Sequence, residues 1–266
     1  MIDLHSHLLP GIDDGPRTLA ESVEMARVMA ADGVTLVAAT PHVRDDYPTA
    51  VEVVEDGVRE VQAALAAAGV DIEVRTGGEV AVDWANGAGA GDLRGYGLGG
   101  NPGVLLVEFP YLGWPLELGM VCSRLLGEGI TPVLAHPERN DRVQAQPDRL
   151  EELVARGVLV QLTASSVTGR RGSRSRKAAD QLLAAGLAHL VASDSHRAPG
   201  PGGRLSDAAA ALEDTALAAW LLRDVPSALV AGAPIPDRPA SKRRGLGWRS
   251  RLLRREVGGR HSGTSD

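Results

Sequence analysis

The sequence predicts an α/β fold built on parallel strands, either a barrel or a doubly wound sheet. Short apolar runs that are typical of buried strands alternate along the chain with segments of helical periodicity. No hairpin signature separates one apolar run from the next. Repeated strand–helix units of this kind indicate parallel strands, because parallel neighbours need a long crossover connection.

Seven strands and five helices follow from this pattern. The strands are expected at residues 2–5, 35–39, 71–78, 104–108, 131–135, 159–163 and 189–193. The helices are expected at residues 18–31, 51–68, 116–126, 148–155 and 175–185. Gly33 and Gly69 follow the first two helices, where glycine commonly ends a helix. Residues 84–102 are rich in Gly and Ala, and they are predicted to form a loop with little regular structure.

The chain divides into an acidic body and a basic tail. Residues 237–266 hold nine Lys and Arg against three Asp and Glu, a net charge of +6. Since the whole chain carries −6, residues 1–236 carry −12. We predict one domain over residues 1–236 and a mostly disordered tail over residues 237–266. The acidic body argues against nucleic-acid binding.

The tail has two interpretations. Residues 248–257 could form a short basic amphipathic helix, in which Trp248, Leu252 and Leu253 lie among arginines. Such a helix favours weak contact with an anionic membrane surface. The alternative is a solvated extension that the protein does not need.

The expected compartment is the cytoplasm. The N-terminus has no basic start followed by a long apolar run, so no signal peptide is predicted. No apolar stretch of about 18 residues predicts a spanning helix. Cys122 is the only cysteine, which excludes an intrachain disulfide and fits a reducing compartment.

Residues that commonly bind metals gather at the ends of the predicted strands. Six of the seven strands end in, or are directly followed by, such residues: His5, His7, His42, Glu79, Glu108, His136, Asp194 and His196. The sixth strand ends instead in Gln161 and Thr163, which are poor ligands. In a parallel barrel the carboxyl ends of all strands open on one face, so these side chains are expected to meet there.

The ligand types narrow the choice of metal. Imidazoles and carboxylates without a thiolate suit Mn, Fe or Zn and disfavour a structural zinc site. More ligands are present than one ion needs, so two or three divalent ions are expected. Such a cluster activates water and holds the oxygens of a phosphoryl group.

The order and spacing of these motifs resemble the polymerase-and-histidinol-phosphatase (PHP) superfamily. The segments concerned are HSH (5–7), TPH (40–42), GGE (77–79), AHPERN (135–140) and SDSH (193–196). Within the superfamily, LPGIDDGP (9–16), LVEFP (106–110) and QLTASSVTG (161–169) resemble bacterial manganese-dependent protein-tyrosine phosphatases of capsule and exopolysaccharide operons. The resemblance covers residues 1 to about 232.

The resemblance implies a single-domain, distorted (β/α)7 barrel of the PHP type with three metal ions, Mn²⁺ being expected. One ion would be held by His5, His7, Glu79 and Asp194, a second by Glu79, Glu108 and His136, and a third by Asp14, His42 and His196. We call these the nine predicted ligands. Asp13 is expected to shape the turn beside Asp14. Arg139 and Arg204 would contact phosphate oxygens, with Arg197 as the alternative to Arg204.

The resulting hypothesis is a metal-dependent phosphomonoesterase that acts on phosphotyrosine in proteins, with a bacterial tyrosine kinase of capsule or exopolysaccharide synthesis as the expected partner. A hydroxide bridging two metals would attack phosphorus, and His42 or a metal-bound water would protonate the leaving tyrosinate. Cys122 has no arginine six residues on and no phosphate-cradling loop, which sets aside a cysteine mechanism.

Two other functions stay open from the sequence. One is a small-molecule phosphatase, such as a histidinol-phosphatase. The other is a non-catalytic regulator that binds a tyrosine kinase, although a complete ligand set argues against it. A nuclease is disfavoured by the acidic body. The family also includes oligomers, so a homo-oligomer is compatible with the resemblance.

Overall fold

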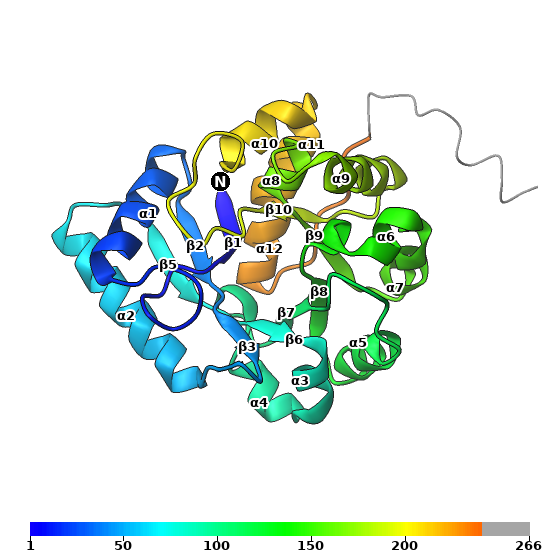
Figure 1. Ribbon diagram of the computed structural model, residues 1–266, viewed down its shortest axis with the longest axis horizontal. Coiled ribbons are helices and arrows are strands. Elements are labelled where there is room, and N and C mark those ends of the chain that lie inside the picture. The colour runs from blue at the N-terminus through cyan, green and yellow to red at the C-terminus, as the bar shows by residue number, and fades with distance from the viewer. Residues whose placement is uncertain (241–266) are drawn as a thin grey trace, which may run out of the picture.

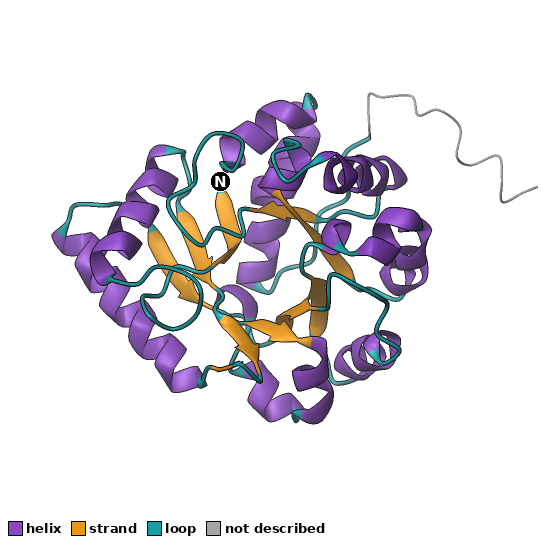
Figure 2. Cartoon of the chain, in the orientation of Figure 1, coloured by secondary structure: helices purple, strands orange, loops and turns teal. Residues whose placement is uncertain are grey.

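The protein forms a ring of parallel strands surrounded by helices (Figures 1 and 2). The computed structural model describes residues 1–240. The strands are β1 (Ile2–Ser6), β2 (Leu36–Ala39), β3 (His42–Arg44), β4 (Tyr47–Pro48), β5 (Glu73–Thr76), β6 (Glu79–Ala81), β7 (Val104–Glu108), β8 (Thr131–Leu134), β9 (Leu159–Thr163) and β10 (Leu190–Ala192).

The α-helices of the described residues are α1 (Leu19–Ala31), α2 (Val51–Ala67), α3 (Val82–Gly87), α4 (Ala90–Arg94), α5 (Leu118–Gly127), α6 (Asp141–Ala145), α7 (Glu151–Ala155), α8 (Ala164–Val167), α9 (Ser173–Ala185), α10 (Leu205–Leu212), α11 (Thr215–Ala219) and α12 (Val225–Ala231). Three 3₁₀ turns, η1 (Leu98–Gly100), η2 (Pro137–Arg139) and η3 (Pro147–Leu150), and the π-helical turn η4 (Trp220–Asp224) complete the described elements.

The ring consists of two sheets, and it confirms the predicted parallel barrel. One sheet has the order β1-β2-β5, and the other has the order β10-β9-β8-β7-β6-β3-β4. Every pair is parallel except β3 with β4. The ring closes between β1 and the end of β10, where Asp194 N donates to His5 O and His7 N donates to Ser195 O, both at 2.9 Å.

Two of the seven strand segments are broken in the middle, which distorts the barrel. The chain passes from β2 to β3 through Thr40 and Pro41, and from β5 to β6 through Gly77 and Gly78. A Cβ atom on Gly77 would lie 2.9 Å from Thr40 Cγ2, so a larger residue would push the two breaks apart. Glu79 N donates to Pro41 O at 3.0 Å, which joins the two segments beyond the breaks.

Four of the five predicted helices lie where the pattern places them, and the fifth is shorter than predicted. Thr18 caps α1 by accepting a hydrogen bond from Glu21 N at 3.3 Å. The segment predicted as one helix over 148–155 consists of η3 followed by α7. The prediction of a loop over 84–102 was wrong, because α3, α4 and η1 occupy most of it. Helices of five or six residues are too short to show helical periodicity.

The end of the described chain packs on the barrel. Trp220 Nε1 donates to Pro236 O at 2.9 Å, and Arg238 Nη1 donates to Ala188 O at 2.7 Å. The predicted disordered tail and the amphipathic helix at 248–257 otherwise lie outside the described residues. Among residues 1–240, no helix combines the length and the apolar character that crossing a membrane requires.

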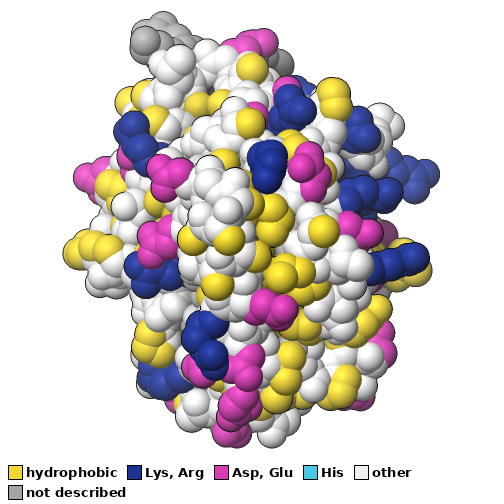
Figure 3. Space-filling model, turned by 90° about the vertical axis from the view of Figure 1, so that its left-hand side faces the viewer, with side chains coloured by type: hydrophobic (Ala, Val, Ile, Leu, Met, Phe, Trp, Pro, Cys, Tyr) yellow, Lys and Arg dark blue, Asp and Glu magenta, His cyan; other side chains and the backbone are white. Residues whose placement is uncertain are grey.

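The core is aliphatic, as the scarcity of aromatic residues requires. Leu105, Leu106 and Val107 of β7 are fully buried, as are Val133 and Leu134 of β8. On the outside, the face shown in Figure 3 mixes acidic, basic and apolar side chains and shows no histidine. The histidines of the strand ends are instead buried or partly buried inside the ring.

Candidate metal centre

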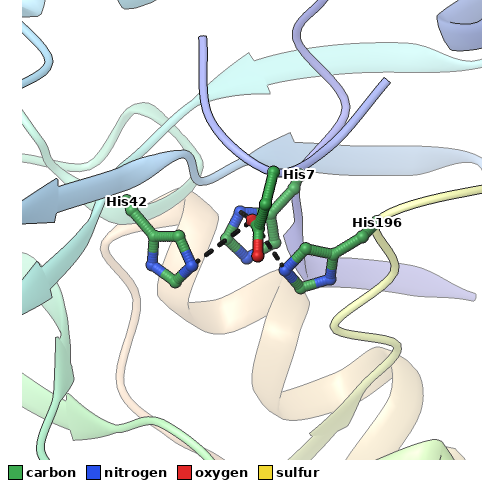
Figure 4. Close-up of side chains that lie close together, drawn as sticks. His7, His42 and His196 are labelled. Carbon is green, nitrogen blue, oxygen red and sulfur yellow. Dashed lines mark ion pairs between the residues drawn. The ribbon is translucent and has the colours of Figure 1, made fainter. Parts of the chain in front are cut away.

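The nine predicted ligands converge at the carboxyl ends of the strands. The register of the parallel pair β3 and β6 places His42 directly beside Glu79. His7 follows β1, and His196 follows β10. Figure 4 shows the imidazole rings of His7, His42 and His196 meeting from these separate parts of the chain. Because of the breaks that precede them, β3 and β6 begin at the site, with His42 and Glu79 as their first residues.

The ligand atoms form four overlapping groups, within each of which they lie no more than 4.8 Å apart. The groups are His7, Asp14, His42 and His196; His5, Glu79 and His136; His5, His7 and Asp194; and His42, Glu79 and Glu108. All nine predicted ligands belong to at least one group. Glu79 is shared, because Oε1 lies 2.8 Å from His136 Nε2 and Oε2 lies 2.9 Å from His42 Nδ1.

The buried polar atoms of the site fit a cation. His5 Nε2, His7 Nε2, His42 Nδ1 and Glu79 Oε2 are buried and have no hydrogen-bond partner. Both His5 Nε2 and His7 Nε2 lie 3.3 Å from an oxygen of Glu79. Buried polar atoms without partners are costly unless another group satisfies them. Nitrogen and oxygen atoms that face one another in this way suit divalent ions of the Mn, Fe or Zn type.

The charges of the cluster shift several pKa values. Burial opposes the charged forms of His5 and Glu79, yet their attraction raises the pKa of His5 to about 9 and holds the pKa of Glu79 well below its usual range. Burial likewise opposes ionisation of Asp194, but His5 and His7 lower its pKa. In Glu108, burial and the charge of Glu79 both raise the pKa. Positive charge is therefore required to balance these carboxylates, and bound cations would replace the protons of His5 and His7.

Asp13 shapes the expected turn and also contacts two of the predicted ligands. Its Oδ1 accepts a hydrogen bond from Gly15 N at 3.0 Å, which is the turn contact. Its Oδ2 lies 2.7 Å from His7 Nδ1 and accepts from His42 N at 3.0 Å. Asp13 thus orients two predicted ligands, a role that the sequence pattern did not indicate.

Gln161 is a second supporting residue that the pattern missed. Its Oε1 lies 3.0 Å from His5 Nδ1 and accepts a hydrogen bond from His136 N at 3.2 Å. His136 and Asp194 have φ values of 35° and 53°, in the left-handed region that non-glycine residues seldom adopt. The contact with Gln161 helps hold His136 in this strained conformation.

A cavity of about 800 Å³ opens above the cluster and is lined by arginines. Arg139 pairs with Asp194, and its guanidinium lies 4.5 Å from the centre of the Tyr111 ring. Arg197 also lines the cavity. Arg204 is not among the lining residues; it occupies the position before α10, and its Nε donates to Pro199 O at 3.4 Å.

Cys122 lies away from this cavity. It is buried within α5, and burial raises the pKa of its thiol to about 12. A thiol of this kind is not ionised near neutral pH and is a poor nucleophile.

The chain also matches known proteins over most of its length. The sequence profile of the family described as "Capsular polysaccharide synthesis, CpsB/CapC" matches residues 1–221. The chain belongs to the CpsB/CapC family. A relative in Bacillus subtilis, the tyrosine-protein phosphatase YwqE, is 32% identical over 205 residues, which cover 74% of this chain and 77% of YwqE. The tyrosine-protein phosphatase CpsB of Streptococcus agalactiae is 28% identical over 202 residues, covering 74% and 83%.

The fold matches that of the same family. A crystal structure from work on YwqE of Bacillus subtilis and CpsB of Streptococcus pneumoniae, described there as "unique metal-dependent tyrosine phosphatases", superposes with a TM-score of 0.80. The sequences are 29% identical, and the superposition covers 91% of this chain and all of the other. The predicted PHP-type barrel and the predicted family are confirmed.

Proposed function

We propose that this CpsB/CapC chain is a metal-dependent protein-tyrosine phosphatase. The observation that carries the proposal is the convergence of nine residues with nitrogen and oxygen ligand atoms, seven of which line a cavity that arginines also line. The names of the relatives support the same activity. We further propose that the ions are two or three, with Mn²⁺ preferred, and that the substrate is a phosphotyrosine protein such as a bacterial tyrosine kinase.

When bound, the divalent ions would supply an activated water and neutralise charge on the phosphoryl group. The residues of the chain position and balance this chemistry. Arg139 is held beside the cluster by Asp194 and against the ring of Tyr111. Its planar guanidinium suits two equatorial oxygens of a phosphoryl group at the cavity floor. A fixed guanidinium there stabilises charge as the phosphoryl group is transferred.

His42 is better suited to hold a metal than to donate a proton. Its Nδ1 lies 2.9 Å from Glu79 Oε2, and its Nε2 lies 3.5 Å from Asp14 Oδ1. Both ring nitrogens therefore face carboxylates of the cluster. The leaving tyrosinate needs little assistance, because tyrosine has a pKa near 10. We propose that His42 acts as a ligand and that solvent in the cavity supplies the proton.

The test compares phosphotyrosine peptides with histidinol phosphate as substrates of the full chain. We expect turnover of the peptides that a chelator abolishes and Mn²⁺ restores, and a much lower kcat/KM for histidinol phosphate. Cys122→Ser should keep full activity, because the thiol is buried and protonated. Chelator-resistant turnover, or a preference for histidinol phosphate, would contradict the proposal.

A further inference from the structure

A strongly basic segment borders the cavity of this otherwise acidic body. Residues 164–177 contain five cationic side chains and no Asp or Glu, whereas residues 1–236 as a whole carry −12. Its cationic residues are Arg170, Arg171, Arg174, Arg176 and Lys177. Arg170 and Arg171 line the same cavity as seven of the nine predicted ligands. This segment therefore adds two positive charges to the wall of the cavity.

The loop that carries these two arginines is anchored. Arg171 N donates to Ser165 O of α8 at 2.9 Å. Thr168 Oγ1 donates to Gly202 O at 2.5 Å, and Arg170 Nη1 donates to Pro201 O at 2.6 Å. These contacts join the loop after α8 to the loop after β10, which lie side by side in Figure 1. Arg170 thus supports the wall, and the backbone of Arg171 is held at the rim.

The Arg171 side chain, like that of Arg197, differs from the paired arginines of the cavity. Arg139 pairs with Asp194, and Arg44 pairs with Asp46 and lies 3.6 Å from Glu108. Arg171 is exposed, and its guanidinium has no ion pair or hydrogen bond within residues 1–240. An unpaired guanidinium at the rim is free to bind an anion from solution.

The cavity is large enough to hold a phosphate at the ligand cluster and a second group at Arg171. A cavity of about 800 Å³ is several times larger than one phosphoryl group needs. Arg139 lies at the ligand cluster, where the phosphate of a bound phosphotyrosine would be. The chain on either side of that phosphotyrosine must cross the rim, where the exposed Arg171 lies.

We propose that Arg171, supported by Arg170, forms a second anion subsite that binds an acidic group near the phosphotyrosine of the substrate. The chemistry is a guanidinium with either a carboxylate of Asp or Glu or the phosphate of a second phosphotyrosine. The proposal rests on the proposed function, since it concerns which residues the same site prefers beside the phosphotyrosine of its substrate.

The experiment measures binding rather than turnover. Three fluorescent peptides carry a non-hydrolysable phosphonate analogue of phosphotyrosine with neutral neighbours, with Glu neighbours, or with a second analogue nearby. Dissociation constants are measured by anisotropy with the Mn²⁺-loaded full chain, and with its Arg171→Ala and Arg171→Glu variants. Arg156→Ala is the matched control, because Arg156 is an exposed arginine at the C-terminal end of α7 that does not line the cavity and is paired with Glu152. Turnover of phosphotyrosine peptides is measured in parallel.

We expect the wild-type chain to bind an acidic peptide about five-fold more tightly than the neutral one at low salt, as one well-placed surface charge pair would give. The ratio should fall below two in Arg171→Ala, fall further in Arg171→Glu, and stay near five in Arg156→Ala. The two acidic peptides distinguish carboxylate from phosphate as the preferred group. Equal binding of all three peptides by the wild type, or an unchanged ratio in both Arg171 variants, would overturn the subsite. Absent turnover with intact binding ratios would instead contradict the phosphatase activity.

Discussion

Asp13 and His7 are joined by a short contact, with Asp13 Oδ2 2.7 Å from His7 Nδ1. This contact leaves His7 Nε2 directed at Glu79 and Asp194. His7 is fully buried; burial opposes its charged form, but Asp13 together with Asp194 and Glu79 raises its pKa well above the usual value. A carboxylate behind a ligating imidazole fixes the ring and makes it a stronger ligand.

Replacing Asp13 by Asn should therefore weaken metal binding without removing a ligand. The amide oxygen can still accept the hydrogen bond of Gly15 N, but the amino group that replaces Oδ2 cannot accept from His42 N and no longer charges the ring of His7. We expect the affinity for Mn²⁺ to fall by roughly 10- to 100-fold, measured by competition with a chromophoric chelator. Asp71→Asn is the matched control, since Asp71 is exposed in the loop before β5. Equal Mn²⁺ affinity in the two variants would show that Asp13 serves the turn alone.

Gln161→Leu should destabilise the metal-free chain. The substitution leaves His136 N and the Nδ1 of His5 buried without an acceptor, and each lost partner costs about 1–3 kcal/mol. We expect the free energy of unfolding to fall by about 2–4 kcal/mol, measured by urea denaturation in the presence of a chelator. Gln181→Leu, on the exposed side of α9, should change it by less than about 0.5 kcal/mol. A loss as small as that of the control would mean that the Gln161 contacts contribute little.

These two supporting residues mark the limit of what the sequence could predict. Eight of the nine predicted ligands follow from the strand ends, because parallel strands in a ring bring their carboxyl ends to one face regardless of loop detail. Asp14 lies in the loop after the first strand, and its prediction rested on the family resemblance alone. Gln161 lies inside a buried strand, where a polar residue signals a partner but does not say which. Asp13 is six residues from His7, and only the folded turn brings the two side chains together.

In the fold, too, features that follow from local sequence patterns could be predicted, and features that depend on tertiary contacts could not. The barrel follows from alternating apolar runs and helical segments, which are local patterns. The breaks at Thr40–Pro41 and Gly77–Gly78 do not, because they arise where two neighbouring segments and Tyr96 approach closely; a Cβ atom on Gly78 would lie 2.9 Å from the Tyr96 ring. Glycines in the sequence predict a bend or a close approach, but the approaching group comes from the tertiary structure.

The arginines of the cavity should differ in their effect on turnover. Arg139→Ala should lower kcat/KM by about 100- to 1000-fold, as removal of a positioned donor does elsewhere, and Arg139→Lys should recover little because Lys cannot bind two oxygens in parallel. Arg197 lines the cavity and Arg204 does not, so we expect Arg197→Ala to lose more activity than Arg204→Ala. The reverse order would assign the second phosphate contact to Arg204. The control variant Arg59→Ala, at an exposed position of α2, should keep full activity.

A histidine outside the cluster should make stability depend on pH. Val160 N donates to His189 Nδ1 at 3.1 Å, which requires the neutral ring. Burial, together with the charge of Arg238, lowers the pKa of His189 to about 4. The unfolded chain binds a proton near pH 6.5, whereas the folded chain does not bind it until about pH 4. The stabilisation is therefore complete above pH 6.5 and is lost as the pH falls from 6.5 towards 4.

The variant His189→Asn isolates this effect. The Asn side chain can accept the hydrogen bond of Val160 N, but it does not titrate. We expect the stability difference between wild type and variant to shift by about 2 kcal/mol between pH 7 and pH 5, with the wild type losing more. Urea denaturation at several pH values in this range measures it. The carboxylates of the cluster cancel in this difference, because both proteins contain them. A difference that stays constant from pH 7 to pH 5 would show that His189 is protonated in the folded chain as readily as in the unfolded one.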